Sequence, residues 1–195
     1  MAKYFMLPAR RCHKQFDQGR ARALTVSTEK HNVEGALMAT TRQNFLLVVT
    51  AAQRWDGGVV SGFDVAQRRL RDREWPLYKN TRNRSVVTSG DRLMFYVAGT
   101  GVNRMCVVAT ATVVKIEKIL TPSSYHERKE LCVPFADLLI RLDQVVILPS
   151  PVSFRARLSG LDCRPTNMGK WGAILQGGCR RLTDRDFTIL SGEDT

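Results

Sequence analysis

Aromatic, amide and cationic side chains lie close together in the stretch WPLYKNTRNRSVVTSGD, residues 75–91. The faces of Trp and Tyr rings can stack on bases, and each stacked base is worth about 1 to 3 kcal/mol. Asparagine amides can donate and accept hydrogen bonds at a base edge, while lysine and arginine can hold the flanking phosphates. The stretch therefore favours a nucleic-acid-binding surface over a solvated loop. Its candidate binding residues are Trp75, Tyr78, Lys79, Asn80, Arg82 and Asn83.

A basic helix is predicted directly before this stretch, in GFDVAQRRLRDREW. Asp64 stands where an N-cap belongs and Gln67 follows three residues later, which resembles a capping box. Pro76 pushes Trp75 out of helical geometry, so we expect the helix to end there and a loop to follow. The arginines of the helix and of the loop are candidate phosphate contacts. They are Arg68, Arg69, Arg71, Arg73 and Arg84.

The net charge of the chain indicates a polyanionic partner. Its 195 residues include 30 Lys and Arg against 18 Asp and Glu, which gives a net charge of +12 and a pI near 10.0. Such an excess is typical of proteins that bind nucleic acid, and less often of proteins that bind anionic membrane surfaces. The alternative is charge that serves solubility alone.

Membrane insertion, secretion and metal binding are not favoured by the sequence. The longest apolar run, FLLVVTAA, is far shorter than the roughly 20 residues that span a bilayer, and the N-terminus has no apolar signal segment. The five cysteines form no Cys-x-x-Cys pair, which predicts reduced thiols in a cytoplasmic protein. No cysteine and histidine spacing is that of a zinc site. We therefore expect no metal, no cofactor and no membrane partner.

A hydrolytic enzyme acting on nucleic acid is one alternative function, and a protein-interaction adaptor without base recognition is another. Metal-dependent hydrolysis needs clustered carboxylates, but the aspartates are scattered over separate predicted elements. The histidines are His13, His31 and His126, and none belongs to a pattern of nucleophile, base and orienting group. The GTG at 99–101 is typical of a hairpin turn rather than of a phosphate-binding loop. The sequence thus favours a binding domain without catalysis.

Strands dominate the predicted secondary structure. Apolar or alternating runs predict strands at 45–50, 92–98, 105–119 and 136–148, and we expect Pro149 and Pro151 to end the last of them. Thr183 is the predicted N-cap of a short final helix. Several strands with helices at the margins, and no alternation of strand and helix, predict an α+β mixed barrel with flanking helices.

Three parts are expected along the chain. Residues 1–43 are predicted to be a basic, poorly ordered arm, or an over-extended start if Met38 begins the protein. Residues 44–191 are predicted to form the folded domain, and residues 192–195 a tail.

The order of these signals resembles the EVE domain family. The strand FLLVVT is followed by Trp55, by Trp75, by the Lys/Asn/Arg-rich loop, by GDRLMFYVAG, and near the end by KWGAILQGGCRRLTDRDF. The resemblance covers about residues 44–191. It implies a PUA-like barrel, related to domains that recognise modified bases in DNA or RNA, with a pocket for one modified base. Many EVE domains occur beside nuclease or restriction modules, so the resemblance also implies a separate nuclease or restriction-type partner.

Aromatic stacking and the positions of the residues predict which side chains would surround such a base. Trp75, Trp171 or Tyr96 would be the stacking platform, and Thr50 at the end of the first strand would close the opposite wall. Trp55 is a further aromatic candidate. For each Trp the alternative is core packing, and for Tyr96 it is an inward-facing barrel side chain. The sequence departs from the family at Ala51–Ala52 and at Pro76, and nothing in it separates DNA from RNA.

Overall fold

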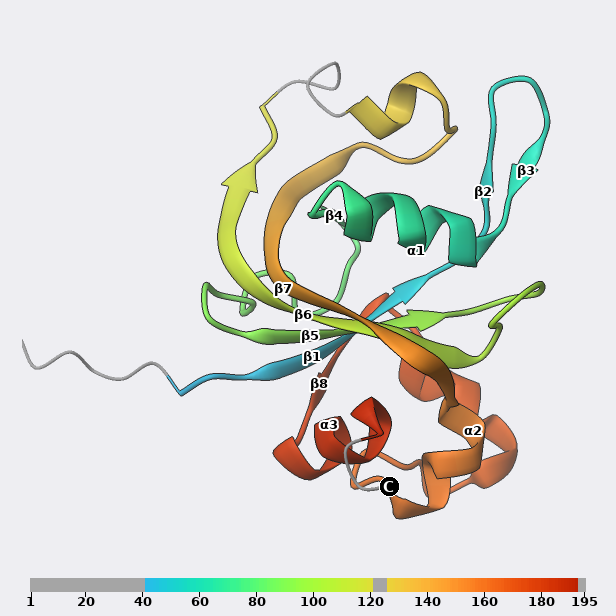
Figure 1. The fold of residues 1–195 in the computed structure, drawn as a ribbon, viewed down its shortest axis with the longest axis vertical. Coiled ribbons are helices and arrows are strands. Elements are labelled where there is room, and N and C mark those ends of the chain that lie inside the picture. The colour runs from blue at the N-terminus through green and yellow to red at the C-terminus, as the bar shows by residue number, and fades with distance from the viewer. Residues whose placement is uncertain (1–40, 121–125, 193–195) are drawn as a thin grey trace, which may run out of the picture. The chain divides into compact units, whose positions relative to one another are not determined.

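The structure is a computed structural model that describes residues 41–120 and 126–192 (Figure 1). Most of the predicted arm, with His13 and His31, and the last residues of the predicted tail lie outside the described residues. The division into arm, domain and tail therefore stays a prediction.

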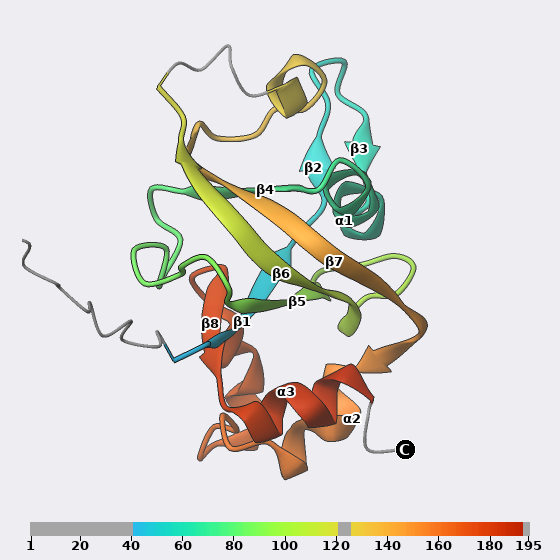
Figure 2. The ribbon, with the colours of Figure 1, turned by 60° about the vertical axis from the view of Figure 1, so that its left-hand side comes forward.

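The fold is built on a six-stranded mixed sheet with the order β4-β7-β6-β5-β1-β8 (Figures 1 and 2). β1 is parallel to β5, and all the other neighbouring strands are antiparallel. The pairing of β6 with β7 shifts register at three points, and such bulges bend the two long strands so that the sheet curls into a half-barrel. The strands are β1 (Asn44–Val49), β4 (Glu74–Tyr78), β5 (Arg92–Val97), β6 (Cys106–Lys118), β7 (Ala136–Ser153) and β8 (Cys179–Leu182).

A small hairpin and several short helices complete the described part. The hairpin consists of β2 (Ala52–Gln53) and β3 (Val59–Val60). The α-helices are α1 (Gly62–Arg71), α2 (Phe154–Arg157) and α3 (Asp184–Ser191), and the 3-10 helices are η2 (His126–Lys129), η3 (Leu158–Gly160) and η4 (Met168–Leu175). Of the helices that the structure describes, none is both long and apolar enough to cross a membrane.

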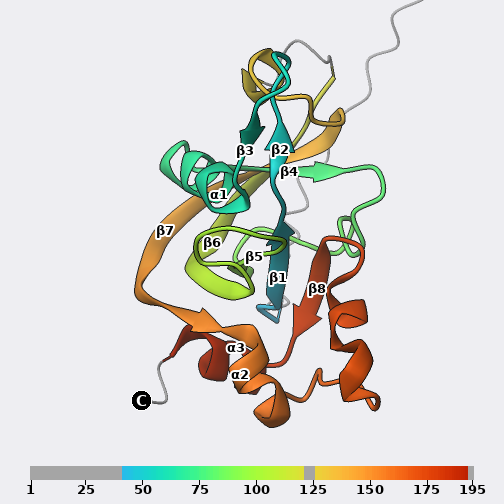
Figure 3. The same cartoon turned by 90° about the vertical axis from the view of Figure 1, so that its right-hand side faces the viewer.

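Two hydrophobic clusters cover the two faces of the sheet. Successive side chains of a strand point to opposite faces, so Phe45 packs in the first cluster and Leu46 in the second. The first cluster lies under α1, while the second lies among α2, η3, η4 and α3. Figure 3 shows this separation, with α1 on one side of β1 and β5 and with α2 and α3 on the other. The predicted α+β barrel with flanking helices is confirmed.

Helix caps were predicted correctly in one case and incorrectly in the other. Thr183 accepts a hydrogen bond from the backbone N–H of Asp186 and is the N-cap of α3, as predicted. The N-cap of α1 is Ser61 rather than Asp64, because the Ser61 hydroxyl accepts from the Asp64 N–H at 3.1 Å. The same hydroxyl donates to the Asp64 carboxylate at 2.7 Å, so Asp64 is the third helical position of the capping motif.

Pro149 and Pro151 do not end their strand as predicted, and Pro76 lies in a strand where a loop was predicted. Pro76 lies inside β4, an edge strand, opposite Leu139, so part of the predicted loop is a strand. β7 continues through Pro149 and Pro151 to Ser153. A proline lacks the N–H that a central ladder requires, but an edge or a bulge tolerates it. Both prolines of β7 lie where its pairing with β6 is interrupted.

Candidate functional site

A hollow of about 340 Å³ lies on the face of the sheet that carries the second hydrophobic cluster. It is formed where β1 and β5 end, beside the connection from β5 to β6 and the last turns of η4. Its lining residues are Val48, Tyr96, Ala98, Gly99, Met105, Trp171, Gly172, Leu175 and Gln176. None of these carries a formal charge, and most are apolar. This lining suits a flat, uncharged ligand.

Two of the predicted aromatic residues meet at this hollow. Trp171 is partly exposed and stacks on Phe154 with the ring centroids 6.1 Å apart, while Tyr96 meets the same Phe154 edge-on at 5.5 Å. Burial raises the pKa of Tyr96 to about 12, so its hydroxyl stays protonated at neutral pH. Trp171 therefore offers the reachable ring, and Tyr96 forms part of a neutral floor.

The predicted loop after β4 packs against the C-terminal wall of the hollow. Arg82 N–H donates to the Gly177 carbonyl at 2.7 Å, and the Asn83 amide donates to the Cys179 carbonyl at 3.2 Å. Gly177 has φ +90°, and a Cβ added there would lie 2.9 Å from Cβ of Arg82, so only glycine allows this approach. The Asn83 amide thus donates one hydrogen bond to the protein itself, and its contact with a base stays a prediction.

Trp75 is a core residue and not the stacking platform that we predicted. It is 2% exposed, and its ring centroid is 4.4 Å from that of Phe95. The guanidinium of Arg69 lies over its ring at 5.2 Å and also donates to the Tyr78 hydroxyl at 3.0 Å. Trp75 belongs to the cluster on the α1 face, whereas Tyr96 and Trp171 lie on the opposite face. Pairing of β4 with β7 produces this burial.

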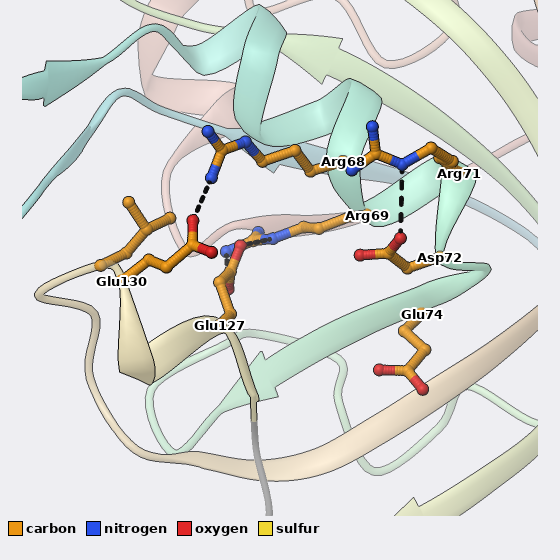
Figure 4. Close-up of a pocket in the computed structure, with 8 residues that line it drawn as sticks. Arg68, Arg69, Arg71, Asp72, Glu74, Glu127 and Glu130 are labelled. Atoms are coloured by element: carbon orange, nitrogen blue, oxygen red, sulfur yellow. Dashed lines mark hydrogen bonds and ion pairs between the residues drawn. The ribbon is translucent and has the colours of Figure 1, made fainter.

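The arginines predicted to contact phosphate are paired with carboxylates. A pocket between α1 and η2 contains three of them together with four carboxylates (Figure 4). Within it Arg69 makes two hydrogen bonds to Glu127, at 2.9 and 2.8 Å, and both side chains are less than a tenth exposed. Arg69 is therefore structural, and its predicted phosphate contact is wrong. The exposed pairs are Arg68–Glu130, Arg71–Asp72 and Arg73–Asp143, while the pair Arg84–Asp137 is half-buried.

The remaining predicted residues lie away from the hollow's lining. Thr50 is exposed just after β1, and Trp55 is 59% exposed on the connection between β2 and β3. Lys79 and Asn80 are exposed on the turn after β4. Contacts of these four residues with nucleic acid stay predictions.

Three cations beside the hollow form no ion pair within residues 41–120 and 126–192. They are Arg82, Arg104 and Lys170. Arg104 precedes the lining residue Met105, and Lys170 precedes Trp171. Sequence reasoning missed Arg104 and Lys170, as well as the lining residues Met105 and Gln176. The local signal that could have indicated them is a cation directly before a large side chain, in Lys170–Trp171 and in Arg104–Met105.

Groups of three or more His, Cys, Asp or Glu side chains that could hold a metal ion do not occur in the part of the chain that the structure describes.

No family model and no curated protein matches the sequence. Solved structures with a similar fold do exist. The N-terminal domain of Staphylothermus marinus McrB aligns with a TM-score of 0.51 and 6% identity over 76% of this chain and 93% of that domain. Human THYN1, solved in complex with DNA containing 5-methylcytosine, aligns with a TM-score of 0.46 and 12% identity over 78% of this chain and 97% of that one. Agrobacterium tumefaciens protein Atu2648 aligns with a TM-score of 0.41 and 14% identity over 77% of this chain and 92% of that one.

The likeness to the McrB domain is one of fold. The curled mixed sheet with flanking helices is the α+β barrel fold that the sequence resemblance implied.

Proposed function

We propose that this protein binds nucleic acid and receives one modified base in the hollow between β5 and η4. The observation that carries the proposal is an uncharged, aromatic-lined hollow with three cations beside it that form no ion pair among the residues that the structure describes. The fold shared with the McrB domain supports it.

Stacking on Trp171 would supply much of the energy for taking up the base. Extruding a base from its stack costs a few kcal/mol, and stacking on an aromatic ring returns about 1 to 3 kcal/mol. The Gln176 side chain can donate and accept hydrogen bonds at the base edge. The apolar remainder of the lining would leave an ionised group without a partner, so the ligand is a neutral base.

Phosphates would contact Arg82, Arg104 and Lys170, which belong to three different segments around the hollow. Because surface arginines that already pair with carboxylates contribute less net positive charge, we place the main electrostatic attraction here rather than on α1. A separate nuclease or restriction-type protein is the partner that the EVE resemblance implies.

The proposal is tested by a binding screen with matched tryptophan variants. DNA and RNA strands and duplexes each carry one modified base, beginning with 5-methylcytosine, and are compared with unmodified strands of the same sequence. We expect tighter binding to at least one modified strand and about a tenfold loss or more in Trp171→Ala, corresponding to the stacking of one base.

Trp55→Ala is the control, since it removes an exposed tryptophan that does not line the hollow. Equal affinity for all strands would contradict the base-binding hollow and would indicate binding through a basic surface alone. A loss in Trp55→Ala with none in Trp171→Ala would place the base elsewhere.

A further inference from the structure

The connection between β5 and β6, residues 98–105, forms one side of the hollow through Ala98, Gly99 and Met105. Four of its residues have positive φ: Gly99 (+85°), Gly101 (+102°), Asn103 (+56°) and Met105 (+57°). Glycine adopts this conformation freely and asparagine more readily than most residues. Methionine has no such preference, so its presence there is a departure from what the backbone favours.

Hydrogen bonds on both sides hold Met105 in this conformation. Its N–H donates to the Val97 carbonyl at 2.7 Å, and its carbonyl accepts from the Phe154 N–H at 3.0 Å. Phe154 is the ring on which Trp171 stacks, so the backbone of Met105 is tied to the aromatic wall of the hollow. The side chain is half-buried and packs with the second hydrophobic cluster.

Met105 also differs from the other apolar lining residues in the type of its side chain. Tyr96 and Trp171 are fixed by their contacts with Phe154, and Gly99 and Gly172 leave open space, since a Cβ at either would meet no atom within 4 Å. A methionine side chain is unbranched, with three rotatable bonds, and fills irregular gaps. It is the longest flexible apolar group of the lining.

We propose that Met105 determines how large a group attached to the base the hollow accepts. Its side chain lines the same hollow as the open positions Gly99 and Gly172, and so would admit a small substituent and exclude a bulky one. This inference rests on the proposed function and assigns a specificity-determining residue within that site.

The test compares Met105→Gly with Asn103→Gly. Both replace a residue at positive φ with glycine in the same connection, but only Met105 lines the hollow. The probes are oligonucleotides with cytosine bearing hydrogen, methyl or propynyl at C5, and adenine bearing hydrogen, methyl or benzyl at N6. We expect the wild-type protein to bind a methylated strand at least about tenfold more tightly than the strand with the propynyl or benzyl group. Met105→Gly should lower this ratio of affinities about fivefold or more.

The control variant should keep the wild-type ratio. Melting temperatures within about 4 °C of the wild type would show that both variants are folded, because relief of the positive φ offsets the lost side chain. A folded Met105→Gly variant with the wild-type ratio would overturn the role of Met105 while leaving the base-binding hollow intact. A wild-type protein that binds every strand equally would overturn the proposed function and this inference together.

Discussion

The indole ring of Trp171 lies over the ring of Phe154, with centroids 6.1 Å apart and planes 26° from parallel. Phe154 is fully buried at the start of α2, and its ring also meets Tyr96. One core ring therefore supports both aromatic residues that line the hollow.

Phe154→Leu should weaken binding as well as stability. Losing the aromatic contacts should lower the free energy of unfolding by about 1 to 3 kcal/mol in urea titrations, and Trp171 loses its support. The matched control is Phe95→Leu, which removes the ring that lies tilted against Trp75 in the other cluster. We expect similar destabilisation in the control with unchanged affinity for nucleic acid. An equal loss of affinity in both would show that Phe154 acts only through stability.

The position of the phosphate-binding surface can be tested with two sets of three neutralising substitutions. The first set is Arg82→Gln, Arg104→Gln and Lys170→Gln; the second is Arg68→Gln, Arg71→Gln and Arg73→Gln. Each phosphate contact contributes about 0.9 to the slope of log affinity against log salt on duplex DNA. We expect the first set to reduce this slope by about 2 to 3 and the second by less than about 1. Similar reductions of the slope by the two sets would show that arginines on and after α1 also contact phosphates, as the sequence predicts.

Local signals predicted β1, β5, β6 and most of β7 and the positions of α1 and α3, but not β4, β8 or α2, and not which surface α1 offers. Among the aromatic candidates, Tyr96 and Trp171 line the hollow. Arg69 finds its carboxylate partner 58 residues away, and Arg73 finds Asp143 70 residues away. Such pairings depend on the tertiary fold. Trp75 was misplaced for the same reason, because its burial follows from the pairing of β4 with β7, far away in the sequence. The backbone of Met105 is likewise set by bonds to Val97 and Phe154.

The buried pair Arg69–Glu127 should contribute more to folding than its exposed neighbour Arg68–Glu130. Glu127→Gln removes the carboxylate that accepts two hydrogen bonds from the buried Arg69 guanidinium, and breaking such a pair costs about 3 to 5 kcal/mol. Glu130→Gln should cost less than about 1 kcal/mol, because that pair is exposed to solvent. Urea unfolding of both variants measures the difference. Equal, small losses would show that Arg69 is well solvated without Glu127.

Stability should decline at alkaline pH through two thiols. Burial raises the pKa of Cys179 to about 12 and that of Cys163 to about 11, above the ordinary value of 9.0. The unfolded chain thus releases these protons first, so their contribution is complete below about pH 9 and is lost as the pH rises through the folded values.

The decline is measured as the urea midpoint at about pH 8 and about pH 10.5. The variant Cys163→Ala/Cys179→Ala should lose less stability over this interval than the wild type. Cys132→Ala removes an exposed thiol and should behave like the wild type. A decline that is the same in all three proteins would assign the pH dependence to other groups.

The most direct test of the base-binding hollow is to fill it. A Cβ at Gly172 would meet no atom within 4 Å, so Gly172→Leu can place a side chain in the hollow without displacing the fold, and Ala173→Leu adds the same side chain at the next, exposed position. The measurement is the ratio of affinities for the preferred modified strand and its unmodified counterpart. We predict that Gly172→Leu brings this ratio to about one, while Ala173→Leu keeps the wild-type ratio of about ten or more. An unchanged ratio in a folded Gly172→Leu variant would contradict the account.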